Sequence, residues 1–303
     1  MKTPNVMHFY LEPGLKESAE AGTHNFLNKL ANVGRAAGMT LKFSGNSAAE
    51  LAASDPTREF AVVHMEPAPH GRAVTVRRAY YYPFWSIELS EKRWEFDVAL
   101  DDFYAASVPV EEAKQFVARW RRKWFDGWEA QERGHVYVPL QGRLLERRSF
   151  QECAPIEMIR DVLEFEPKRR VIAALHPKES YGEAEIAALE ALGEKHRRLS
   201  VEVGEIERLL PGCKYIVTQN SSAGFAGYFW GKPLVLFGRI DFHHIAAKVW
   251  ESEPAAAIGM APDLAPDYDA YLYWFLQLRS INAGRPEAEE KIAARLRGFG
   301  WPT

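Results

Sequence analysis

The arrangement of the chain is decided by residues 215–238, whose sequence is YIVTQNSSAGFAGYFWGKPLVLFG. A short apolar run over 215–218 predicts a strand, and residues 223–230 have the pattern of a helix. A Gly-Lys-Pro tripeptide then interrupts the helix before a second apolar run over 234–237. This order predicts a strand, a loop, a helix and a second strand, which is the unit from which parallel sheets are built.

The rest of the second half repeats this alternation. Short apolar runs predict strands at 136–140, 171–175, 199–203, 215–218 and 234–237. Helical patterns fall between them, at 155–163, 183–196, 205–210 and 223–230. Short continuous apolar runs are typical of strands that are buried on both faces. Five such strands with four crossovers predict a Rossmann-like domain.

The first third shows a shorter version of the same pattern. Strands are expected at 6–10, 39–43, 60–64 and near 73–79, and helices at 26–37 and 48–53. Two more helices are expected at the end of the chain, at 267–281 and 286–299. The predicted fold class is therefore α/β, with two Rossmann-like domains at 1–130 and 131–303 and the final helices in the second.

Length and charge agree with two ordinary globular domains. The chain has 303 residues, and domains commonly contain about 150. Its formal charge is 38 − 41 = −3, which argues against recruitment of nucleic acid by a bulk positive field. No apolar run approaches the roughly 20 residues of a membrane span, and we expect no signal peptide. Two cysteines cannot form a disulfide framework, so the expected location is the cytoplasm.

Two strand ends in the second half carry groups that suit a phosphate. Ser221 and Ser222 stand where a helix begins, a position at which hydroxyls and free backbone N–H groups can hold an anion. Gly224 would let a ligand approach the backbone closely, although plain helix capping explains the serines equally well. His176 ends a strand and precedes Pro177, where it could donate to a phosphate or a leaving group; a structural histidine is the alternative.

The loop after the strand at 136–140 is rich in polar groups. Gln141 supplies an amide, Glu146 a carboxylate, and three arginines supply the planar forks that suit carboxylates and phosphates: Arg143, Arg147 and Arg148. A solvated basic loop is the alternative. The sequence contains no cluster with the spacing of a known metal site.

These three loops together resemble the capsule polysaccharide biosynthesis family, which includes bacterial β-Kdo transferases. The resemblance rests on Pro-Leu-Gln ending at Gln141, on His-Pro at His176, and on Asn-Ser-Ser-Ala-Gly-Phe followed by Gly-Lys-Pro; it covers about residues 135–245. It implies a GT-B fold, two Rossmann-like domains facing across a cleft. It also implies a CMP-activated acidic sugar as donor, a glycan or glycolipid acceptor, and no metal or other cofactor.

The resemblance also implies roles for individual residues. Gln141, His176, Ser221, Ser222 and Gly224 would bind the nucleotide and its phosphate. Arg143 and Arg147 would bind the acidic sugar.

The catalytic carboxylate departs from the family pattern. Retaining members carry an Asp a few residues after the Gln, and here the nearest carboxylate is Glu146, which could act as nucleophile or base beside a catalytic His176. This departure leaves two alternatives to a glycosyltransferase. One is a noncatalytic member that binds a glycan or an assembly partner, and the other is a nucleotide-sugar epimerase.

The first half offers candidates for the acceptor side. His64 and Glu66 follow a predicted strand, and either could act as a base for an acceptor hydroxyl. The aromatic residues at 80–85 could contact sugar rings. The mixed aromatic and cationic segment 119–124 would suit a membrane surface or an assembly protein, but Trp120 and Trp124 share one helical face, which favours burial.

Overall fold

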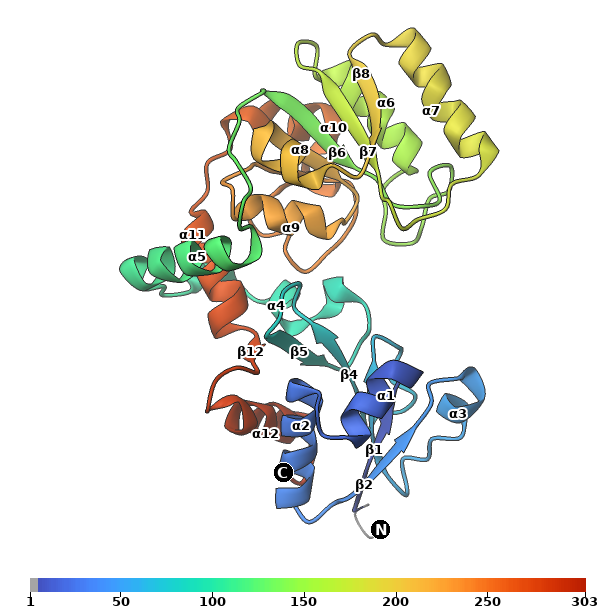
Figure 1. Ribbon diagram of the computed structural model, residues 1–303, viewed down its shortest axis with the longest axis vertical. Coiled ribbons are helices and arrows are strands. Elements are labelled where there is room, and N and C mark those ends of the chain that lie inside the picture. The colour runs from blue at the N-terminus through green and yellow to red at the C-terminus, as the bar shows by residue number, and fades with distance from the viewer. Residues whose placement is uncertain (1–4) are drawn as a thin grey trace. The chain divides into compact units, whose positions relative to one another are not determined.

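The computed structural model describes residues 5–303 and divides the chain into two compact units. The first unit comprises the chain up to Asp101 together with Phe275–Thr303. The second unit comprises Asp102–Trp274. Each unit contains one six-stranded sheet with helices packed against it (Figure 1).

The sheet of the second unit confirms the five strands that we expected in this half. It consists of β6 (His135–Pro139), β7 (Val171–Leu175), β8 (Leu199–Val203), β9 (Cys213–Thr218), β10 (Leu234–Leu236) and β11 (Ala247–Lys248). All neighbouring strands are parallel, in the order β11-β10-β9-β6-β7-β8. Numbered from β6, this is the Rossmann order 3-2-1-4-5-6, with β6 beside the point where the order reverses.

Helices cover this sheet and bury its apolar side chains. They are α6 (Pro155–Phe165), α7 (Glu183–Lys195), α8 (Ile206–Gly212), α9 (Ser222–Tyr228) and α10 (Val249–Met260). In α6, Pro155 occupies the first turn, where a missing N–H costs nothing, and Ile159 and Val162 lie in the core. All five residues of β6 and of β7 are buried, as expected for strands that are covered on both faces.

The second unit also contains α5 (Val110–Trp124), which packs against α11 (Tyr268–Tyr273). Phe116 and Trp120 are buried, and the Trp120 ring stacks on that of Trp124 with centroids 4.4 Å apart. The burial that we expected for this aromatic face is confirmed for Trp120, whereas Trp124 is half-buried. The structure places the division of the chain before α5 and not near residue 130, because this face packs within the second unit.

The first unit has a parallel core with an antiparallel edge. Its strands are β1 (Val6–Tyr10), β2 (Thr40–Ser44), β3 (Phe60–His64), β4 (Ala73–Arg78), β5 (Phe84–Glu88) and β12 (Ile281–Asn282). The order is β12-β5-β4-β3-β1-β2; β1, β2 and β3 are parallel as expected, and β4 also runs parallel to β3. β5 runs antiparallel to both of its neighbours, and the sequence pattern did not reveal it.

Helices of the first unit are α1 (Pro13–Glu20), α2 (Asn25–Ala36), α3 (Ala48–Ala52), α4 (Asp97–Leu100) and α12 (Ala288–Gly298). Figure 1 shows α12, in dark red, beside α2, in blue, and these two helices are in contact. Ala288, Ile292 and Leu296 of α12 are fully buried in the core of the first unit. The end of the chain therefore belongs to the first unit, whereas we expected it in the second.

The packing of α12 in the core of the first unit can be tested at Ile292. Replacing it with Ala removes buried methyl and methylene groups, so Ile292→Ala should lower the free energy of unfolding by about 2–5 kcal/mol. Chemical denaturation followed by circular dichroism measures the change. Glu290→Ala, at an exposed position of the same helix, is the matched control and should shift the free energy of unfolding by less than about 0.5 kcal/mol. Equal, small effects of both substitutions would contradict the burial of α12.

Candidate functional site

Loops that follow four strands of the second unit meet in one pocket of about 540 Å³. They follow β6, β7, β8 and β9, so the pocket lies at the carboxyl edge of the sheet. β6 pairs with β7 on one side and with β9 on the other. The chain therefore leaves β6 toward one side of the sheet and leaves β9 toward the other. Rossmann folds bind their ligands at such a point. The lining includes Leu140, His176, Gly204, Arg208, Ser221 and Ser222.

The two serines have different roles in the structure. Ser221 is the N-cap of α9: its hydroxyl accepts a hydrogen bond from the backbone N–H of Ala223 at 3.3 Å, and the residue is 7% exposed. Ser222 begins the helix and is exposed on the pocket side. The capping alternative therefore applies to Ser221, while the hydroxyl of Ser222 is accessible to a ligand.

His176 presents a hydrogen-bond donor at the pocket. Its Nδ1 accepts a hydrogen bond from the backbone N–H of Lys178 at 3.2 Å. A neutral imidazole carries its single proton on the other nitrogen, so Nε2 is a donor. The backbone N–H of His176 donates to the Tyr181 hydroxyl at 2.8 Å, which holds the loop after β7 in place. The side chain is exposed and lines the pocket, so Nε2–H can reach a ligand oxygen.

Gly224 does not serve the ligand approach that we expected of it. It is buried, and a Cβ atom built on it would lie 3.1 Å from both methyl groups of Leu234 and 3.4 Å from Phe242. The glycine is therefore needed for close packing of α9 on β10 and Phe242, and not for contact with a ligand. In this respect the assignment of Gly224 to the binding site is wrong.

Gln141 lies beside the main pocket and not in its lining. With Arg148, Thr218 and Gln219 it lines an adjoining cavity of about 10 Å³. Nε and Nη2 of Arg148 are shielded from solvent and have no hydrogen-bond partner among the described residues. Burial lowers the pKa of the Arg148 guanidinium from its ordinary value. Among the loop arginines, Arg148 is thus the one placed beside the carboxyl end of β6.

The other residues of this loop lie outside the pocket lining. The side chains of Glu146 and Arg143 are each 67% exposed, and they approach one another only to 3.8 Å, between Oε2 and Nη1. Arg147 Nε donates to the carbonyl of Gln151 at 2.8 Å, which makes Arg147 a support for the loop. The structure therefore brings together His176, Ser221 and Ser222, but not Glu146, Arg143 or Arg147.

One lining segment escaped the sequence analysis, namely the loop after β8. Gly204 and Glu205 both have positive φ angles, of 70° and 58°, and they turn the chain so that Arg208 lines the pocket. Arg208 forms ion pairs with Glu202 and with Glu205. The hydrogen bond that Arg208 donates to Glu205 and the charge of Glu202 raise the pKa of Arg208. The strand-end rule that selected His176 would have selected this loop after Val203 as well.

The candidates of the first unit lie at a corresponding position. β1 stands between β2 and β3, so the strand order reverses there too. Nδ1 of His64, at the end of β3, lies 3.0 Å from Oε1 of Glu12, which follows β1. Glu66 is half-buried two residues further on. The structure thus pairs His64 with Glu12, a partner that the sequence did not suggest.

The aromatic stretch at 80–85 is mainly structural. Trp85 is 2% exposed and stacks on Phe26 at 4.6 Å between ring centroids. Tyr82 is the most exposed of the large side chains in this stretch, at 47%. The buried rings of Phe84 and Trp85 therefore cannot meet a sugar.

Residues 5–303 contain neither a cluster of metal ligands nor a membrane-spanning helix. No three His, Cys, Asp or Glu side chains in that range are grouped so that they could hold a metal ion. None of the helices formed by those residues combines the length and the apolar character needed to cross a membrane.

The segment that builds most of this site also matches a known family. Residues 151–275 match the family model described as "Capsule polysaccharide biosynthesis protein". This segment, which is less than half of the chain, is similar to the capsule polysaccharide biosynthesis family. The match includes His176, Ser221 and Ser222 and begins after Gln141. No curated protein sequence is significantly similar to the chain.

Solved structures to which the chain is similar include two Kdo transferases and a wall teichoic acid polymerase. Thermosulfurimonas dismutans KpsC, beta Kdo 2,7 transferase, has 11% identity, covers 97% of this chain and 99% of its own, and has a TM-score of 0.57. The beta Kdo 2,4 transferase of KpsC from the same organism has 15% identity, covers 80% and 82%, and has a TM-score of 0.47. The wall teichoic acid polymerase TagF, H444N variant, has 9% identity, covers 98% and 88%, and has a TM-score of 0.32.

The expected fold class is confirmed. The chain is α/β and consists of two units with largely parallel, Rossmann-like sheets, and it shares the GT-B-like fold of the first of these structures. At 11% identity that likeness extends to the fold alone. The resemblance to the capsule polysaccharide biosynthesis family is likewise confirmed.

The different roles of the two serines can be tested by substitution. Ser221→Ala removes the cap of α9 and should lower the free energy of unfolding by about 0.5–2 kcal/mol. Ser222→Ala removes an exposed hydroxyl and should change it by less than about 0.5 kcal/mol. Urea denaturation of the two variants and the wild type measures both effects. A larger loss of stability in Ser222→Ala would contradict the assignment of the cap to Ser221.

Proposed function

We propose that the chain is a glycosyltransferase of surface polysaccharide biosynthesis, of capsule or lipopolysaccharide. It transfers Kdo or a related acidic sugar from a CMP-sugar donor to a glycan or glycolipid acceptor. The observation that carries this proposal is the pocket at the carboxyl edge of the second sheet, where His176 and the two serines of a segment from the capsule polysaccharide biosynthesis family meet.

The pocket has the groups that a donor phosphate requires. Ser222 offers an exposed hydroxyl beside the first backbone N–H groups of α9, and His176 offers Nε2–H. Arg208 adds a positive charge to the lining. Such fixed donors can stabilise the charge that develops on a departing nucleotide without a metal ion. In this proposal His176 donates to the leaving phosphate and Ser221 positions the helix. Gln141 contacts the nucleotide from the adjoining cavity.

The acidic sugar and the acceptor use groups outside this pocket. Arg143 and Arg147 are exposed and could approach a sugar carboxylate from the loop after β6. Glu146, on the same loop, is the carboxylate that the resemblance assigns as nucleophile or base. On the first unit, the His64–Glu12 pair and Glu66 would accept the proton of an acceptor hydroxyl.

A location in the cytoplasm, in peripheral contact with the inner membrane or with capsule assembly proteins, completes the proposal. The exposed cations of α5 support it. Arg119, Arg121, Arg122 and Lys123 are exposed on the helix whose aromatic face is buried.

Donor binding is tested by isothermal titration calorimetry with CMP. The wild type should bind CMP, and His176→Ala and Ser222→Ala should each weaken binding about 10- to 150-fold, because each removes one hydrogen bond to a charged phosphate, worth about 1.5–3 kcal/mol. Lys195→Ala, at an exposed position of α7 away from the pocket lining, is the control and should bind as the wild type does. A wild type that does not bind CMP, or variants that bind it equally well, would refute this donor site.

The role of Glu146 separates a transferase from a noncatalytic member of the family. Release of CMP from CMP-Kdo upon addition of acceptor glycans measures transfer. If Glu146 is the nucleophile, Glu146→Gln should reduce that rate by at least about a thousandfold, comparable to the loss of other catalytic nucleophiles, and leave CMP affinity unchanged.

A second candidate function is a binding protein for glycans or assembly partners. Two observations favour it: Glu146 is highly exposed, and it is not among the residues that line the pocket. A wild type that binds CMP but releases none from CMP-Kdo with any acceptor would support that candidate.

A further inference from the structure

A hydrogen-bonded chain of three side chains crosses one face of the first sheet. Nε2 of His8 lies 2.8 Å from Oγ of Ser44, and Nδ1 of His8 lies 2.7 Å from Oε2 of Glu59. His8 is on β1, Ser44 ends β2, and Glu59 immediately precedes β3. A nucleophile, a base and a carboxylate that orients the base are arranged in this order in acyl-transfer enzymes.

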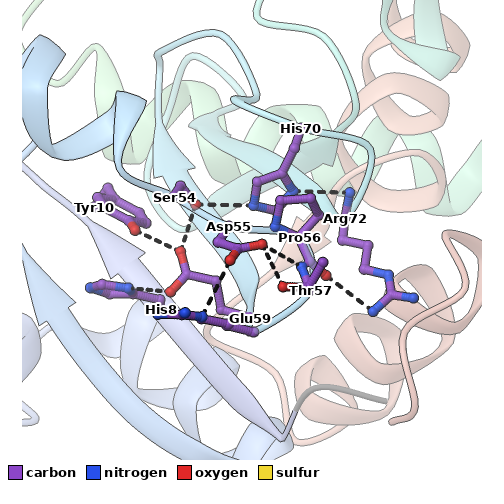
Figure 2. Close-up of polar contacts among 10 residues, drawn as sticks. His8, Tyr10, Ser54, Asp55, Pro56, Thr57, Glu59, His70 and Arg72 are labelled. Atoms are coloured by element: carbon purple, nitrogen blue, oxygen red, sulfur yellow. Dashed lines mark hydrogen bonds and ion pairs between the residues drawn. The ribbon is translucent and has the colours of Figure 1, made fainter. Parts of the chain in front are cut away.

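The hydrogen bonds around Glu59 keep its carboxylate ionised and hold the orientation of its side chain. Figure 2 shows its carboxylate receiving bonds from His8, Tyr10 and Ser54; the last two donate to Oε1 at 2.6 and 2.5 Å. Burial alone would raise the pKa of Glu59, but the hydrogen bonds from Ser54, Tyr10 and His8 outweigh it and hold that pKa below its ordinary value. Burial and the bond to Glu59 raise the pKa of Tyr10 to about 12, so its hydroxyl remains a donor.

An ionised Glu59 determines the tautomer of His8. A carboxylate only accepts hydrogen bonds, so Nδ1 of His8 must carry the proton. In the neutral imidazole Nε2 is then unprotonated and accepts the hydroxyl proton of Ser44. This is the state in which a histidine can remove that proton when the serine oxygen attacks an electrophile.

The three residues open onto a pocket of about 430 Å³ in the first unit. His8 and Lys42 are paired across β1 and β2, and Ser44 follows Lys42 on the same face. Lys42 and Arg58 also line this pocket and supply positive charge near Ser44, together with the acidic Glu50 and Asp55. The lining is mainly polar, which suits a hydroxylated compound better than a long acyl chain.

We propose that Ser44, His8 and Glu59 form a second catalytic site, which hydrolyses esters of small carboxylic acids with hydroxylated compounds. The inference rests on the side-chain geometry and the pocket, and it is independent of the glycosyltransferase proposal, whose residues it does not share.

The proposed reaction proceeds in two steps. Oγ of Ser44 bonds to the ester carbonyl carbon while its proton passes to Nε2 of His8. The bond to the alcohol oxygen then breaks, and that oxygen leaves as the alcohol with the proton from His8. Water attacks the acyl-serine, gives one proton through His8 to Oγ of Ser44, and releases the carboxylic acid. Lys42 lies where it can stabilise the negative charge on the carbonyl oxygen during both attacks.

The site is tested by covalent labelling of the full chain with an ethoxy fluorophosphonate, a reagent for activated serines. Intact-mass spectrometry should show one adduct on the wild type, and peptide mapping should place it on Ser44. Ser44→Ala should give no adduct. His8→Gln should slow labelling by a factor of about 100 or more, because positioned bases contribute 10²–10⁴-fold. Ser18→Ala, which removes a serine hydroxyl of the same unit that donates to the carbonyl of Leu15, should label as the wild type does.

Two outcomes would overturn the proposal. One is the absence of an adduct on the wild type or an adduct mapped to another residue, a result that does not depend on how any variant folds. The other is an unchanged labelling rate in His8→Gln, which would show that the histidine is only structural. Hydrolysis of p-nitrophenyl acetate provides the functional measurement: the wild type should show turnover that Ser44→Ala loses, and equal turnover of the two proteins would also refute the site.

Discussion

The parallel pairing of β6 with both β7 and β9 is the constraint on which the second unit depends. β6 is the first strand of this sheet in the chain, yet it stands in the middle, so the later strands must add on both sides of it. The loops after β6 and β9 therefore separate at the carboxyl edge and leave space between them. His176 and Ser222 reach the same space because their strands end at the same edge. The pocket is thus a consequence of strand order, and the side chains give it its chemistry.

The first unit also has its first strand between two later strands, but different residues meet there. β1 lies between β2 and β3, which brings His64 to Glu12 at the carboxyl edge. The face of the same sheet near α3 has a separate polar cluster, in which His8, on β1, lies between Ser44 and Glu59. Its members lie on β1, at the end of β2 and just before β3. These segments are neighbours in space and distant in sequence. Two separate sets of reactive side chains can therefore occupy one small sheet.

Much of the fold could be predicted from the sequence, and the reasons are local. Runs such as 171–175 and 234–237 are short, apolar and bounded by breakers, and both became strands buried within a parallel sheet. The positions of His176 and Ser222 could be predicted because each stands directly after a strand. Gly224 could not be assigned correctly, because a glycine required for packing and one required for ligand approach look identical in sequence. Its neighbours Leu234 and Phe242 decide between them.

The sequence by itself determined most strands and helices of the second sheet, the parallel core of the first sheet and the candidate donor loops, because periodicity, capping and breakers act over a few residues. Only the tertiary structure decided that α12 joins the first unit, that α5 joins the second, and that Glu146 lies outside the pocket lining. An amphipathic stripe shows that a helix has a buried face, but it does not name the partner that covers it. Likewise, nothing local links His8 to Ser44 and Glu59, since hydrogen bonds between distant segments form only when the strands that carry them are aligned.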